Sequence, residues 1–215
     1  PLIKYFLTYI VCYFCIGSCI GISVPVSQAF GAGKNTDLRK YFINGVYFAL
    51  AIAVIMTAVT ASMSGLFLTW LKTPENIFKD AHVYLVIIFL GLPLTVLYNF
   101  CFGLLMAFGD SKKSTIFMAV STVINIFLDL FLVVVVKWGV AGAAIATIFS
   151  QGIAGVLSAV YIFKKYKLLF PVNADERKFN PYYMKNIIKM CMPMGLQYSI
   201  TAIGAIILQF YVNAL

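Results

Sequence analysis

Six long apolar stretches, separated by polar turns, cover most of this chain. They comprise residues 5–30, 42–71, 81–108, 115–136, 140–163 and 187–215. Each reaches the ~20 residues that a helix needs to cross the hydrocarbon core of a bilayer. Only helices and closed barrels satisfy every backbone hydrogen bond in hydrocarbon, and the alternation typical of barrel strands is absent. The pattern predicts an all-α polytopic membrane protein with six transmembrane helices visible.

The composition agrees with this fold class. Hydrophobic residues make up 62% of the chain and charged residues 11%, whereas ordinary soluble domains have roughly 45–50% and about 25%. The chain begins at Pro1 and ends at Leu215, inside an apolar stretch. We therefore expect it to be a piece of a longer protein with further spans.

The positive charges are distributed unevenly between the turns. Of the 16 Lys and Arg residues, 12 follow the first, third and fifth apolar stretches. The positive-inside rule places these turns in the cytoplasm. The net charge of +9 then reflects contact with anionic lipid at the membrane surface, and we expect no nucleic-acid partner.

One carboxylate interrupts the apolar stretch 115–136. Asp129 is its only charged residue, and Asn125 lies one helical turn earlier on the same face. An ionisable group at this depth costs roughly 2.5–3.5 kcal/mol on insertion scales, and such residues usually mark ion or substrate pathways. The alternative is a buried hydrogen-bonded pair that helps helices to pack.

The next apolar stretch carries matching polar residues. In an antiparallel pair of helices joined at residues 136–140, Asp129 and Thr147 lie at the same depth of about 10 Å, and Asn125 and Gln151 at about 16 Å. These oxygen-bearing side chains suit a proton or a hard cation such as Na+ at Asp129, Asn125 and Thr147. The alternative is an interhelical network with no transport role. We expect no other metal, no cofactor and no enzymatic activity, because no HExxH or GxSxG motif is present.

Small residues indicate close helix packing at two places. Gly17 and Gly21 form a GxxxG motif. A second stripe recurs every four residues and consists of Gly142, Ala146, Ser150, Ala154 and Ser158. Such stripes let the backbones of neighbouring helices approach closely.

Several segments together resemble one transporter family. They are SQAFGAGKNTDLRKYF at 27–42, LLMAFGDSKKS at 104–114, INIFLDLFLV at 124–133, WGVAGAAIATIFSQ at 138–151 and CMPMGLQYSI at 191–200. They resemble the multidrug and toxic compound extrusion (MATE) transporters. The resemblance implies twelve spans in two six-helix lobes. Residues 1–163 would hold spans two to six, residues 164–186 a cytoplasmic linker, and residues 187–215 the first span of the second lobe.

The resemblance also implies functional residues. Asn125 and Asp129 match an Asn-x-x-x-Asp motif on span five of the family, Thr147 matches a threonine on span six, and Tyr84 is the candidate for a tyrosine on span four. No Asp or Glu occurs between 187 and 215, where some members carry a glutamate, which favours the DNA-damage-inducible branch.

The implied function is export of organic cations in exchange for H+ or Na+, by a monomer in the plasma membrane. The alternative is a lipid-linked saccharide flippase of the same superfamily. Such flippases typically carry cationic residues in their cavity, and no apolar stretch here has a central Lys or Arg.

Overall fold

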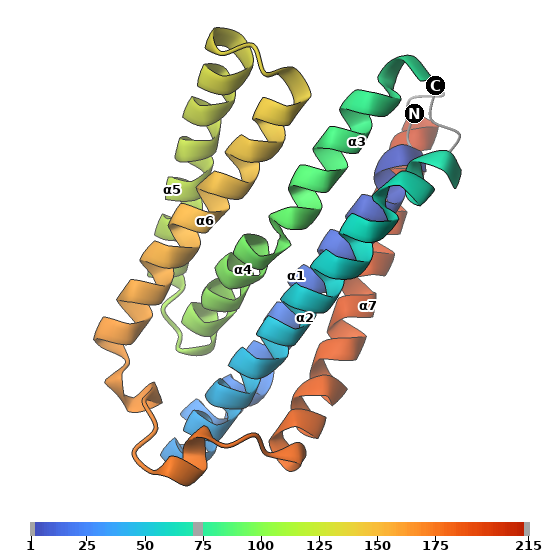
Figure 1. Cartoon of the computed structure of the whole chain (residues 1–215). Coiled ribbons are helices and arrows are strands. Elements are labelled where there is room, and N and C mark those ends of the chain that lie inside the picture. Colours follow the sequence, from blue (N-terminus) through green and yellow to red (C-terminus); the bar gives the residue numbers. More distant parts are fainter. Residues whose placement is uncertain (1–2, 71–74, 213–215) are drawn as a thin grey trace.

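The structure is a computed structural model that describes residues 3–70 and 75–212, and helices are the only regular elements among these residues (Figure 1). The long helices are α1 (Ile3–Gly31), α2 (Asn35–Trp70), α3 (Glu75–Leu90), α4 (Leu92–Ala107), α5 (Ser111–Asp129), α6 (Gly139–Lys165) and α7 (Pro181–Val212). Three short elements complete the chain: the π-helix η1 (Leu130–Val135) and the 3-10 turns η2 (Lys167–Leu169) and η3 (Ala174–Arg177). The predicted all-α class is confirmed.

The membrane-spanning segments follow the predicted stretches closely. In the described part of the chain, four helical segments are long and apolar enough to cross a bilayer: Ile10–Gly31, Asn35–Ser62, Ser111–Val135 and Gly139–Lys165. The bent pair Phe78–Leu90 and Leu92–Ala107 makes a fifth, broken span. The sixth predicted span, 187–215, falls in α7, which is not among these segments, and it stays a prediction. Its last residues, 213–215, lie outside the described residues.

The predicted span 81–108 is broken into α3 and α4, which are bent by 46° at Gly91. Pro93 accounts for the break, because proline has no backbone N–H to continue the hydrogen bonds of α3 and its ring clashes with the carbonyl four residues earlier. The Gly91 carbonyl accepts hydrogen bonds from the backbone N–H groups of Leu94 and Thr95, which begin the new helix. Ile148 of α6 packs where a side chain on Gly91 would lie. The break therefore needs glycine at its centre.

The contact between α1 and α7 is made by backbone as much as by side chains. A Cβ atom on Gly17 would lie 2.6 Å from the carbonyl oxygen of Met194, and one on Gly21 would lie 2.6 Å from Cα of Cys191. Figure 1 shows α7 running alongside α1 and α2, away from the α5–α6 pair. The predicted GxxxG motif is thus a helix-packing motif, and its partner is α7.

The second small-residue stripe packs α6 onto the rest of the bundle. All five of its members are buried: Gly142, Ala146, Ser150, Ala154 and Ser158. Between them, Gly152 lies against Leu94 and Gly155 against the backbone of Tyr98, both on α4. The predicted close packing of this stripe is confirmed.

The charged segment after α6 is docked on α2. Glu176 in η3 accepts two hydrogen bonds of 2.8 Å from the guanidinium of Arg39. The Oδ1 atom of Asn44 on α2 accepts a 3.0 Å hydrogen bond from the backbone N–H of Asn180. At the start of α7, the Tyr183 hydroxyl donates to Asp37 at 2.7 Å. We call residues 166–180 the strap, since they join α6 to α7 across the end of α2.

Candidate functional site

Asp129 stands where α5 changes its helical form. It is the last residue of α5, and the π-helix η1 begins at Leu130. The wider turn is visible in the hydrogen bond from the Val136 N–H to the Phe131 carbonyl, five residues back, at 2.9 Å. Single π-turns inside α-helices are rare and occur frequently at functional sites. No feature of the sequence predicted this one.

One oxygen of the Asp129 carboxylate, Oδ1, is buried without a hydrogen-bond donor. A buried acceptor without a donor costs about 1–3 kcal/mol, and more when it carries charge. This oxygen is therefore available for a proton or a cation.

The neighbouring helix brings Thr147 to nearly the same depth. A Cβ atom on Gly142 would lie 3.1 Å from Cβ of Leu132. The two helices are antiparallel, and Asp129 lies one helical turn before Leu132. Asp129 is therefore about level with Ile145 of α6, and Thr147 lies about half a turn beyond Ile145. The Thr147 hydroxyl donates to the carbonyl of Ala143 at 3.0 Å, which leaves its oxygen lone pairs available as acceptors.

Gln151 is held by a residue that the sequence analysis did not single out. Its Oε1 atom accepts a 2.7 Å hydrogen bond from the hydroxyl of Thr95 on α4. Asn99, one turn further along α4, donates through Nδ2 to the Thr95 carbonyl at 2.8 Å. The signal was present in the sequence, because Thr95 and Asn99 are a polar pair four residues apart in an apolar stretch, as Asn125 and Asp129 are. The pairing of Asn125 with Gln151 stays a prediction.

Tyr84 lies on α3, the outer part of the broken span. Its side chain is half-buried and packs against the hydrophobic core. Its place beside Asp129 remains a prediction from the family resemblance.

The chemistry available at this site is that of oxygen ligands. Carboxylate, amide and hydroxyl oxygens suit protons and hard cations. Among the described residues, no group of three or more His, Cys, Asp or Glu side chains could hold a metal ion.

A bundle of helices long and apolar enough to span a membrane, one of them broken and another carrying a carboxylate, is typical of a secondary transporter. The sequence pattern of the MatE family matches residues 4–131. The chain belongs to this family, whose members are transporters rather than enzymes.

Two curated relatives illustrate the match. The chain is 32% identical over 189 residues to the probable multidrug resistance protein YpnP of Bacillus subtilis, covering 88% of this chain and 42% of the relative. It is 27% identical over 197 residues to the probable multidrug resistance protein NorM of Thermotoga maritima, covering 89% of this chain and 42% of that relative. The chain thus spans less than half the length of these relatives.

Solved structures share the fold. An inward-facing multidrug resistance MATE family transporter of the MOP superfamily superimposes with a TM-score of 0.85 at 19% identity. The match covers 94% of this chain and 46% of that transporter. At this identity the likeness concerns the fold alone.

Proposed function

We propose that this chain is part of a secondary active antiporter that exports organic cations or drugs from the cell in exchange for H+ or Na+. The observation that carries the proposal is the buried Oδ1 atom of Asp129, which has no hydrogen-bond partner. The names of the relatives as multidrug resistance proteins support drugs as the substrate class.

The exchange follows from the charge of one site. A proton or Na+ bound at Asp129 neutralises the carboxylate, and its release leaves an anion in a medium of low dielectric constant. An organic cation stabilises that anion in turn, so the two ligands compete for the same charge. For Na+, the oxygens of Asn125 and Thr147 would complete part of the coordination shell.

The remaining parts of the proposal follow from the family. We place the full-length protein in the plasma membrane as a monomer of twelve spans, and we assign it to the DNA-damage-inducible branch because no acidic residue lies between 187 and 215. Coupling would then depend on the first lobe, which contains Asp129.

The test is dye efflux from vesicles that contain the full-length protein, with a proton or a Na+ gradient imposed separately. One of the two gradients should drive efflux by the unaltered protein. Under that gradient, efflux by Asp129→Asn should fall to the level of vesicles without protein. Asn125→Ala and Thr147→Ala each remove one neutral ligand worth ~1 kcal/mol, so efflux should fall about fivefold. The matched control is Asp110→Asn, a carboxylate in the α4–α5 turn, which should still couple. Normal efflux by Asp129→Asn would place coupling elsewhere.

A further inference from the structure

A cavity of about 200 Å³ lies between α2, α4 and α6, apart from the Asp129 site. Its lining is entirely apolar apart from one cysteine thiol, that of Cys101. Leu50 and Phe163 at its edge are 58% and 46% exposed, so the cavity opens outward from the bundle. Because the helices around it are long and apolar enough to span a membrane, the cavity lies at the depth of the hydrocarbon core.

The length of the cavity matches one leaflet of a bilayer. Its lining runs from Phe42 to Ala53 on α2 and from Pro93 to Leu104 on α4. Each run advances about 16 Å along its helix, and half of a hydrocarbon core is about 15 Å. The cavity extends along the two helices and is open at Leu50 and Phe163. This elongated shape suits one extended acyl chain, part of which stays outside the cavity, better than a compact drug molecule.

The cytoplasmic end of the cavity carries unpaired positive charge. The turn η2 contacts both α6 and α2 there, and the buried side chain of Leu169 packs into the core. Lys164 and Lys167, at the end of α6 and in η2, are exposed, and neither forms an ion pair among the described residues. The nearby acidic groups are occupied, since Asp110 pairs with Lys165 and Glu176 with Arg39.

We propose that this cavity is a lipid site that holds one acyl chain of an anionic phospholipid, with the headgroup at Lys164 and Lys167. The apolar wall receives the chain, and the two lysines select the charge of the headgroup. The acyl chain reaches Pro93 at the end of the cavity farthest from the two lysines. The lipid therefore contacts the break between α3 and α4. The inference goes beyond the proposed antiport and does not depend on it.

The experiment uses purified full-length protein in lipid nanodiscs and phosphatidylglycerol with a photoactivatable group on one acyl chain. After irradiation, labelled peptides are mapped by mass spectrometry. We expect labelling to concentrate on the cavity-lining parts of α2, α4 and α6. Ala49→Phe, which fills the cavity, should reduce this labelling to the level of exposed helix faces. Ala53→Phe provides a second filling variant if the first does not fold.

The matched control is Ala51→Phe. Ala51 lies at about the same depth of α2 but is exposed and outside the cavity, so the lipid should label this variant as strongly as the unaltered protein. Lys164→Gln and Lys167→Gln should each reduce the preference for phosphatidylglycerol over phosphatidylcholine about fivefold, whereas Lys112→Gln should not.

Equal labelling of the Ala49 and Ala51 variants, or equal labelling by the two lipids in the unaltered protein, would overturn the proposal. So would displacement of the lipid by excess dye substrate. Asp129→Asn should bind the lipid normally, which separates this result from a failure of the antiport proposal.

Discussion

The carboxylates in the strap and in the α4–α5 turn differ from the carboxylate in the apolar span in how many donors surround them. Glu176 accepts two hydrogen bonds from Arg39 and two from the backbone N–H groups of Val172 and Asn173. Asp110 accepts from the hydroxyls of Tyr161 and Tyr166 and from Lys165. Asp129, in contrast, leaves a buried oxygen without a donor.

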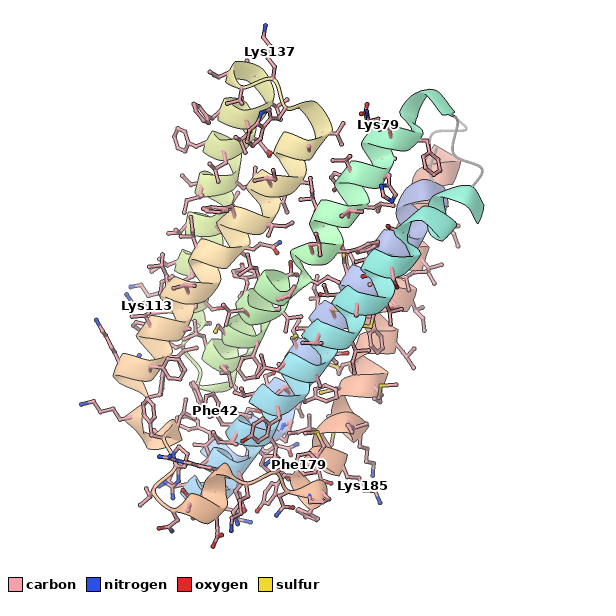
Figure 2. The ribbon with its side chains drawn as sticks, in the orientation of Figure 1. Phe42, Lys79, Lys113, Lys137, Phe179 and Lys185 are labelled. Carbon is pink, nitrogen blue, oxygen red and sulfur yellow. The ribbon has the colours of Figure 1, made fainter. Side chains whose placement is uncertain are left out.

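The difference indicates which carboxylates have a structural role. A carboxylate that holds a loop is stabilised by surrounding donors, and its proton affinity falls. Hydrogen bonds from Arg39 lower the pKa of Glu176 to about 2, and the hydrogen bond from Lys165 lowers the pKa of Asp110. A carboxylate that exchanges ligands must keep a coordination position open. Figure 2 shows many charged side chains at the end of the bundle near Phe179 and Lys185, whereas Lys79 and Lys137 lie at the opposite end.

The largest effect should come from breaking the Arg39–Glu176 pair. Arg39→Ala leaves a buried carboxylate without its counter-ion, which is strongly destabilising. The strap should detach from α2, and chymotrypsin should cleave it after Phe179 at least about tenfold faster, because cleavage follows the population of the open form. The matched control is Lys178→Ala, which removes an exposed ion pair with Asp175. Equal cleavage of the two variants would contradict a structural role for the buried pair.

An intermediate effect should come from acid. Because the pKa of Glu176 falls from 4.5 to about 2 on folding, its contribution is fully present above pH 4.5 and is lost as the pH falls toward 2. A spin label at Ala174→Cys in the strap should become mobile over this range. In Glu176→Gln the label should already be mobile at pH 7 and should respond little to acid. A strap that stays immobile at pH 2 would show that other contacts hold it.

The smallest effect should come from Asp129 itself, when stability rather than transport is measured. Asp129→Asn removes no hydrogen bond from the buried Oδ1 atom, so the free energy of unfolding should change by less than about 0.5 kcal/mol or rise slightly. Asp110→Asn should lower it by about 1 kcal/mol through its weakened contacts with Lys165 and Tyr161. The midpoint of thermal unfolding distinguishes the two. A larger loss for the Asp129 variant than for the Asp110 variant would reverse the comparison.

The helices were predictable from sequence because membrane spans are selected by length and apolarity alone. Only part of the break at Gly91 could be predicted from the sequence. Pro93 predicts a kink, but the sequence does not show that Ile148 of another helix fills the space beside Gly91. The docking of the strap was not predictable, because the partner of Glu176 lies 137 residues away in the sequence. Such pairings depend on how α2 and α6 lie in space.

The candidate site shows the same limit. Asn125, Asp129 and Thr147 could be chosen from their spacing and from the family resemblance. The hydrogen bond between Thr95 and Gln151 could not, since it joins α4 to α6 across 56 residues. No local sequence pattern predicts the π-helix after Asp129 either. Its hydrogen bonds differ from those of an α-helix by one residue, and Leu132 within it packs against Gly142 of the neighbouring helix.

The glycines that join α1 to α7 limit how this sequence can drift during evolution. At Gly17 and Gly21 the opposing atoms are backbone, which no side-chain rearrangement can remove. Even alanine is excluded there, although alanine is the best helix former. Gly31, at the end of the same helix, has open space around it and can vary freely. One helix therefore contains glycines at which a Cβ atom would clash and a glycine at which it would not, and the neighbouring helix determines which is which.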